Sequence, residues 1–317
     1  MRKRFNFKFI EKRKFFITLS VVLMLASILS TFIFGAELDI QFKGGTIITY
    51  IYDGEINQAQ FNEAVSNALG GAGGFNITTG TDFSSGRNNI QISLTSNEGL
   101  TSDRQFELTH ALTTQFAGNN LELLESADVS PSAGREFFLK CLVAVAFSSL
   151  ALIVYIALRF KHIGGWIAGL CAVAALLHDC VIVYGAFIVF GMSINANFMA
   201  VILTILGYSI NNTIVIYDRI RENDGLHRKT KSRADIINES INQSLTRSIN
   251  TSLTTAVAMI VVTAVAIVYG VGSIVSFSLP MVVGIVAGTY SSICFTCSLW
   301  YVIGEKKGKA VKKTKAA

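Results

Sequence analysis

Charged residues are scarce in this sequence. Asp, Glu, Lys and Arg make up 15% of its 317 residues, whereas about 25% is usual for a soluble globular protein. Hydrophobic residues make up 51%, and the mean hydropathy is +0.50. This composition excludes a single soluble enzyme domain and a disordered chain, and it predicts a membrane protein.

Proline is scarce as well, and so is the alternation of apolar and polar residues that is typical of β-strands. The chain has 2 prolines, and its apolar residues come in continuous blocks of about twenty, the length of a membrane-spanning helix. The strands of an outer-membrane barrel alternate apolar and polar residues instead. The blocks predict a polytopic α-helical membrane protein with six transmembrane helices, at 15–34, 137–158, 164–190, 197–217, 253–271 and 277–302.

Patterns that bind metals or carry out catalysis are missing. All 5 cysteines lie inside apolar blocks, and the C-x-x-C of Cys294 and Cys297 has no second pair, so packing explains these residues best. The glycine-rich run 70–74 follows a predicted helix and lacks a Lys-Ser/Thr pair, which excludes a phosphate-binding loop. An intramembrane hydrolase would need Gly-x-Ser-x-Gly or a second buried carboxylate. We therefore predict no enzyme activity, no cofactor and no metal.

Basic residues are absent from alternate connections between the spans. Connections 191–196 and 272–276 have none, and segment 35–136 has 4 against 13 acidic residues. Connections 159–162 and 218–250 and both chain ends are basic. Because Lys and Arg concentrate on the cytoplasmic side of membranes, we predict that both termini are cytoplasmic. The net charge of +6 is then explained by basic segments that lie next to membrane lipid. Membrane lipid is an expected partner, and nucleic acid is not.

The outer segment 35–136 is long enough to form a small domain. Its pattern predicts the order strand, helix, strand, strand, helix, strand, which is that of a ferredoxin-like (βαββαβ) α+β domain. These elements are expected at 40–52, 56–69, 75–81, 89–95, 101–116 and 121–129. The whole chain then divides into a cytoplasmic N-terminus with the first helix (1–34), the extracytoplasmic domain (35–136), the other five helices with a cytoplasmic loop at 218–250 (137–303), and a basic cytoplasmic tail (304–317).

Ionisable residues are nearly absent from the middle of the predicted spans. Asp179 is the only carboxylate deep inside one. A charge at mid-membrane costs about 2.5–3.5 kcal/mol even on insertion scales. Asp179 is therefore a candidate functional residue, and the alternative is a structural hydrogen bond between helices.

The fourth predicted span has a polar side. At helical spacing its small and polar residues require a protein neighbour rather than lipid. Arg247, at the foot of the fifth span, lies in a run of Ser, Thr and Asn residues, where it is either an interfacial anchor or a charge that faces protein or water. The residues of the polar side are Thr204, Gly207, Tyr208, Asn211, Asn212 and Thr213.

Three segments carry motifs that occur together in one family. They are the Ala-Leu-Leu-His-Asp at 175–179, the block 204–223 with Gly-Tyr-Ser-Ile-Asn-Asn-Thr and Asp-Arg-Ile-Arg-Glu-Asn, and the polar run 240–255. In order, spacing and topology they resemble the SecF family, whose members are partners of SecD in the Sec protein-export machinery. Segment 39–46 is similar to a degraded form of the family's G-I-D-F-x-G-G-T motif.

This resemblance implies a function and a set of partners. The chain would be a six-span half of a resistance-nodulation-division bundle in the bacterial cytoplasmic membrane. It would pair with SecD, act with the SecYEG channel, and contact preproteins through the outer domain. The resemblance also implies that the proton-motive force promotes export. The alternative is an autonomous exporter of the same superfamily, which would have to form a homodimer.

One position departs from the family pattern. The family has Asp where this chain has Asn212, and asparagine cannot carry a proton in this way. The resemblance therefore implies that the titrating carboxylate is Asp179 or a residue of SecD, with Arg247 as the countercharge. Asp179, Arg247 and Asn212 are thus the proton-coupling candidates.

Overall fold

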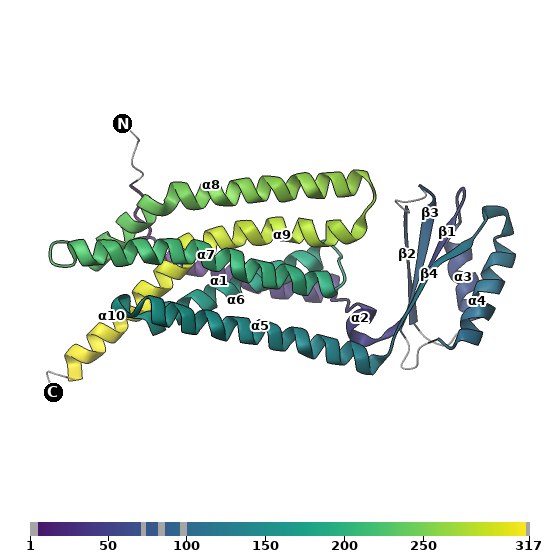
Figure 1. Cartoon of the computed structure of the whole chain (residues 1–317), viewed down its shortest axis with the longest axis horizontal. Helices are drawn as coiled ribbons and strands as arrows, with labels where there is room; N and C mark the ends of the chain where they lie inside the picture. The colour runs from purple at the N-terminus through teal and green to yellow at the C-terminus, as the bar shows by residue number, and fades with distance from the viewer. Residues whose placement is uncertain (1–5, 71–73, 82–85, 96–99, 315–317) are drawn as a thin grey trace.

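The computed structural model describes residues 6–70, 74–81, 86–95 and 100–314, which form a long helical bundle with a small sheet domain at one end (Figure 1). Six helices are long and apolar enough to cross a membrane, which confirms the prediction. The first five are α1 (Arg13–Phe34), α5 (Pro131–Arg159), α6 (Gly165–Val189), α7 (Ala196–His227) and α8 (Arg233–Val268). The sixth consists of α9 (Gly272–Tyr290), the π-helical segment η3 (Ser291–Thr296) and α10 (Cys297–Thr314).

Helices α6 and α7 form the centre of the bundle. Neighbouring helices bury 56% of the most apolar stretch of each, against 11% for α1 and for α5. Both α1 and α5 pack on α6, and their outer faces remain exposed in this chain. Polar side chains on α6 are therefore shielded from lipid, because protein surrounds them.

The connection predicted at 218–250 is a helical hairpin rather than an irregular loop. Helix α7 continues to His227, and α8 begins at Arg233 after an N-cap in which Ser232 accepts a hydrogen bond from the backbone of Asp235. Hydropathy marks the part of a helix that enters the membrane, whereas caps mark where the helix ends. Both helices thus extend beyond the apolar blocks that revealed them.

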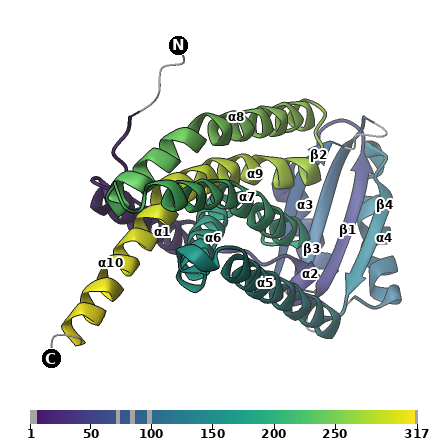
Figure 2. The same ribbon diagram turned by 60° about the vertical axis from the view of Figure 1, so that its left-hand side comes forward.

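The sheet domain has four antiparallel strands in the order β2-β3-β1-β4. Helices α3 and α4 cover the face of the sheet that is turned away from the bundle (Figures 1 and 2). Alternating side chains of β1 and β3, such as Ile48 and Ile92, pack there against Phe61 and Leu112. The elements are β1 (Gly45–Tyr52), α3 (Gln58–Ala68), β2 (Gly74–Thr81), β3 (Asn88–Thr95), α4 (Ser102–Gln115) and β4 (Glu122–Val129).

The strand predicted at 40–52 begins later than expected. A short helix, α2 (Ile40–Lys43), comes first, and β1 starts at Gly45. Asp39 caps this helix by accepting a hydrogen bond from the backbone N–H two residues later,. Gly44 ends it with a φ of 84°, a left-handed conformation that favours glycine,. The cap and the glycine therefore override the strand-like alternation of the sequence.

Helix α2 fastens the sheet domain to the bundle. The Phe42 ring lies 5.6 Å from that of Phe137 and 5.2 Å from that of Phe138 on α5. The backbone N–H of Asp39 donates to the carbonyl of Ile194, between α6 and α7, over 3.0 Å. The sheet is thus connected to the centre of the bundle by packing and by backbone hydrogen bonds.

Candidate functional site

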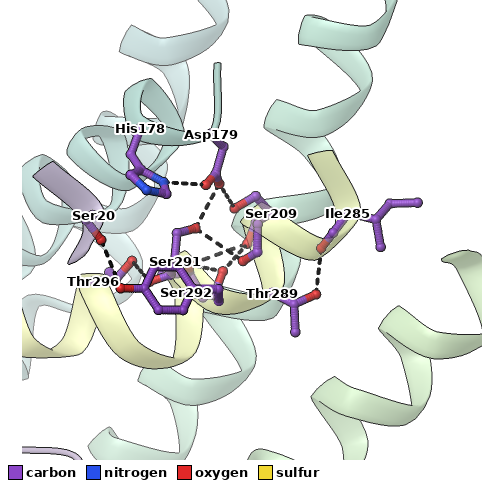
Figure 3. A network of polar contacts seen from close by, with 12 residues as sticks. Ser20, His178, Asp179, Ser209, Ile285, Thr289, Ser291, Ser292 and Thr296 are labelled. Carbon is purple, nitrogen blue, oxygen red and sulfur yellow. Dashed lines mark hydrogen bonds and ion pairs between the residues drawn. The ribbon is translucent and has the colours of Figure 1, made fainter. Parts of the chain in front are cut away.

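Asp179 lies on α6 at the centre of the bundle and is completely buried. Three side chains surround its carboxylate (Figure 3). The hydroxyl groups of Ser209 on α7 and Ser291 in η3 donate to Oδ2 over 2.6 and 2.8 Å. Nδ1 of the adjacent His178 lies 3.0 Å from Oδ1. One carboxylate therefore joins three membrane-spanning helices.

A second layer of hydroxyl groups surrounds these serines. Ser292 donates to the backbone carbonyl of Ser209 over 3.0 Å, and Thr213 donates to the hydroxyl of Ser292 over 3.0 Å. Thr296 donates to the carbonyl of Ser291 over 2.9 Å. These bonds stabilise the wide turns of η3, and π-helical turns within α-helices occur frequently at functional sites.

Glycines on α9 allow the helices to meet at this carboxylate. A Cβ atom at Gly288 would lie 3.1 Å from Cβ of Ser209 and 3.5 Å from Oδ2 of Asp179. One turn earlier, a Cβ atom at Gly284 would overlap the end of the Ile205 side chain. The two glycines let α9 pack closely on α7, and this brings η3 within reach of the carboxylate.

His178 connects the carboxylate with α1. Its buried ring stacks on Phe295 with centroids 5.5 Å apart and lies 6.1 Å from the ring of Tyr290. The Tyr290 hydroxyl donates to the carbonyl of Phe16 on α1 and accepts a hydrogen bond from Ser20. Nε2 of His178 has no hydrogen-bond partner in the described part of the chain, so it is free to accept or donate one more bond.

The cluster can adopt two hydrogen-bonding states. When Asp179 is ionised, it accepts bonds from Ser209 and Ser291. When its carboxylate takes up a proton, the new O–H must donate, and Ser291 can turn to the carbonyl of Gly288, 3.2 Å from its oxygen. None of the bonds to Asp179 comes from a Lys or Arg of the described residues. The hydroxyl of Ser291 thus has an acceptor in either protonation state of the carboxylate.

The residues predicted on the polar side of α7 fall into two sets. One set faces the helices of this chain beside Ser209, and the other is exposed. The sequence predicts that this polar side faces protein. In the structure only the first set packs against other helices of this chain, and the second set forms an exposed polar strip on α7. The buried set is Asn212 and Thr213, with Tyr208 half-buried, and the exposed set is Thr204, Gly207 and Asn211.

Arg247 lies on the exposed side of α8 and is not bonded to Asp179. Exposed polar residues follow it at helical spacing, namely Asn250, Thr251 and Thr254. Helices α7 and α8 are linked side by side, because Asn223 donates a hydrogen bond to Ser240 over 2.8 Å. The structure therefore places exposed polar strips on two neighbouring helices, and leaves Arg247 outside the buried cluster.

The serines of η3 were not among the residues that the sequence singled out. Ser291, Ser292 and Thr296 interrupt the sixth apolar block, and this interruption is the signal that could have revealed them. Ser and Thr are common in membrane helices, where they often bond to the backbone. The pattern alone therefore does not show which hydroxyl groups meet a carboxylate.

Known proteins are similar to this chain in sequence and in architecture. The family described as "Protein export membrane protein SecD/SecF, C-terminal" matches residues 109–306. Protein translocase subunit SecF of Thermobaculum terrenum is 33% identical over 304 residues, which are 92% of each chain. That of Petrotoga mobilis is 33% identical and covers 98% of this chain and 99% of its own.

Relatives in which a SecF-like part belongs to a longer chain also match. SecDF of Bacillus subtilis is 32% identical over 97% of this chain, which corresponds to 39% of its own length. The crystal structure of SecDF from Thermus thermophilus, a translocon-associated membrane protein, superposes with a TM-score of 0.78 and 29% identity, over 95% of this chain and 39% of that one. With its six apolar helices, the chain is a multi-pass membrane protein that belongs to the SecD/SecF family of protein export membrane proteins.

Proposed function

We propose that this chain is a SecF-type subunit of the Sec preprotein translocase, and that it pairs with a SecD-type protein to use the proton-motive force for export. Full-length similarity to proteins named translocase subunit SecF supports the role in export. In the SecDF relatives, this chain corresponds to 39% of the length. That these relatives carry a SecF-like part in a protein named SecDF supports a SecD-type protein as the partner.

The exposed polar strip of α7 is the observation that carries the pairing. Polar groups that face hydrocarbon are unfavourable, whereas small and polar residues are typical of contacts between membrane helices. Thr204, Gly207 and Asn211 thus mark the surface that a SecD-type helix covers. Arg247 and its polar neighbours on α8 extend this surface, and Arg247 would meet a carboxylate of the partner there.

The sheet domain would lie outside the cytoplasmic membrane and contact preproteins, while the bundle contacts the SecYEG channel. Both termini lie at the end of the bundle remote from the sheet (Figure 1), and the basic chain ends favour a cytoplasmic location for that end. The order of strands and helices supports a ferredoxin-like fold for domain 35–136,. Parts 1–34, 137–303 and 304–317 would be the membrane and cytoplasmic parts.

Two proton-sensitive sites follow from this arrangement. Asp179 is the titratable carboxylate inside this chain, and a rearrangement of its serine bonds would move η3 relative to α6 and α7. The second site lies at the interface, where a carboxylate of the partner would meet the exposed Arg247. Since α7 carries Ser209 and also the exposed strip, a shift of this helix would couple the two sites.

Co-expression with a SecD-type protein and measurement of export into membrane vesicles test this proposal. We expect a stable complex, and export that a proton gradient stimulates. Asp179→Asn and Arg247→Ala should both assemble but respond less to the gradient, Arg247→Ala more severely because the interfacial pair loses its countercharge. A monodisperse protein that is fully active without a SecD-type partner would contradict the pairing and favour the autonomous exporter.

A further inference from the structure

A cavity with a cationic rim lies at the end of the bundle remote from the sheet. Its volume is about 310 Å³, and it lies between η2 (Lys161–Ile163), the end of α7, the start of α8 and Trp300 of α10. Asp224 is the one carboxylate among the described residues that line it. The basic residues of its lining are His162, Arg228, Lys231 and Arg233.

The guanidinium group of Arg233 is held in place by a stacking contact on its planar face. Its guanidinium carbon lies 4.3 Å from the centroid of the Trp300 ring. A Cβ atom at Gly304 would lie 2.5 Å from Nη1, so glycine provides the space that the guanidinium occupies. A cation–π contact uses the face of the guanidinium and leaves the N–H groups at its edge free. The side chain is thus preorganised with unused hydrogen-bond donors.

The positive charge around this cavity is only partly balanced. Lys231 pairs with Glu239 over 2.6 Å. The ion pairs formed among the residues that the structure describes include neither Arg228 nor Arg233. Asp224 can balance one of these two arginines at most. The rim therefore favours an anion, and guanidinium groups match the oxygen atoms of phosphate especially well.

The floor of the cavity is apolar. It is formed by the buried side chains of Ile163, Ile220, Ile236 and Ile237. A site for a free phosphate ion surrounds it with polar donors, whereas a phospholipid combines a charged phosphate with an apolar body. The lining residues Ile163, just after the end of α5, and Trp300, in the sixth membrane-spanning helix, lie where these apolar helices are expected to leave the membrane, so we expect the cavity near the level of lipid headgroups.

We propose that this cavity binds the phosphate of an anionic phospholipid, with Arg228 and Arg233 as its ligands and the isoleucine floor beneath the glycerol group. The lipid would connect the α7–α8 turn with η2 and α10. The site is separate from the Asp179 cluster and does not depend on the proposed pairing with a SecD-type protein.

Native mass spectrometry of the full-length chain, extracted from nanodiscs of phosphatidylglycerol and phosphatidylcholine, tests this site. We expect wild type to retain phosphatidylglycerol preferentially. The double variant R228Q/R233Q should retain it on the order of tenfold less, since each arginine near an anionic headgroup contributes to the attraction. The control K12Q/K14Q removes two exposed charges near the same end of the bundle, outside the cavity, and should retain lipid like wild type.

Three outcomes would overturn the proposal. The first is equal retention of phosphatidylglycerol by R228Q/R233Q and wild type. The second is an equal loss in K12Q/K14Q, which would show unspecific charge attraction. The third is displacement of the lipid by excess inorganic phosphate, which would identify a free-phosphate site. Melting in pure phosphatidylcholine checks the fold, because R233Q loses the cation–π contact with Trp300. The single variant R228Q keeps that contact, so it should melt like wild type and still retain less phosphatidylglycerol.

Discussion

Helix α7 carries polar residues on two sides, and the two sides differ in how their polar groups are satisfied. On the inner side, Ser209 and Thr213 are buried and hydrogen-bonded to groups of other helices. On the outer side, the hydroxyl of exposed Thr204 bonds to the backbone of its own helix over 2.7 Å. The inner side therefore stabilises this chain, whereas the outer side is available to another one. Changes on the inner side should lower stability, and changes on the outer side should impair assembly.

The largest effect should come from removing the inner acceptor. Asp179→Leu leaves His178 and Ser209 without their partner, while Ser291 can turn to the carbonyl of Gly288, and each buried unsatisfied group costs about 1–3 kcal/mol. We expect a loss of about 2–6 kcal/mol in the free energy of unfolding, measured in detergent. Asp179→Asn keeps an acceptor of similar shape and should retain most of the stability. A leucine variant as stable as wild type would show that the cluster does not hold the helices together.

A matched pair of glycines sharpens the comparison. Gly288 on α9 faces Ser209, whereas nothing in the described structure lies within 4 Å of a Cβ atom at Gly207 on the outer strip. Gly288→Ala should destabilise the isolated chain by about 1–2 kcal/mol through overpacking. Gly207→Ala should leave it unchanged or stabilise it by up to about 1 kcal/mol through helix propensity. The comparison fails if both variants unfold at the same denaturant concentration.

Leucine substitutions on the exposed strip of α7 should impair assembly with the partner without lowering the stability of this chain. The double variant T204L/N211L should unfold within about 0.5 kcal/mol of wild type, as is usual for surface positions. Its co-purification with a SecD-type partner should fall on the order of tenfold, because the polar contacts of the helix pair are lost. The control V22L/L29V changes two exposed apolar residues of α1 and should co-purify normally. Normal assembly of T204L/N211L would show that the interface with the partner does not lie on this strip.

A subtler change concerns the pH dependence of export. Asn212→Asp restores the acid expected from the family, and a protonated Asp is close in shape to Asn, so the variant should assemble. A carboxylate buried at position 212, one helical turn from Ser209, would carry a charge of the same sign as Asp179, and like charges buried in one bundle hold a proton more tightly, so the pH profile of stimulated export should move to higher pH. The measurement would run from about pH 6 to pH 9, around neutrality, with partner levels matched. Superimposable profiles would place Asn212 outside the coupling network.

The smallest effect is expected at an exposed polar network in the sheet domain. Hydrogen bonds from Asn120 and from Arg87 lower the pKa of Asp53. A lowered pKa stabilises the folded state above the ordinary carboxyl pKa of about 4, and the effect is lost as the pH falls below it. Asp53→Asn should therefore melt slightly below wild type at neutral pH, and the two curves should converge in acid. A difference that persists in acid would show that shape rather than charge is responsible.

Apolar length and isolated charges are the features that the sequence predicts well. The six membrane-spanning helices follow from continuous apolar blocks, and Asp179 stands out because a lone carboxylate is costly in a membrane,. Its partners Ser209 and Ser291 lie 30 and 112 residues away in the sequence, and only tertiary packing brings these common residue types together. Helix α2 was missed because one cap and one glycine decide it locally.

The junction between the sheet and the bundle gives α5 the properties of a rigid lever arm. A single residue, Ser130, separates the end of β4 from the start of α5, so no flexible segment can absorb a rotation there. A helix of 29 residues is about 43 Å long. A tilt of about 5° around its far end would displace the attached strand by roughly 4 Å, from the same helix length. A tilt of α5 in the membrane would thus move β4, the edge strand of the sheet, by a comparable distance.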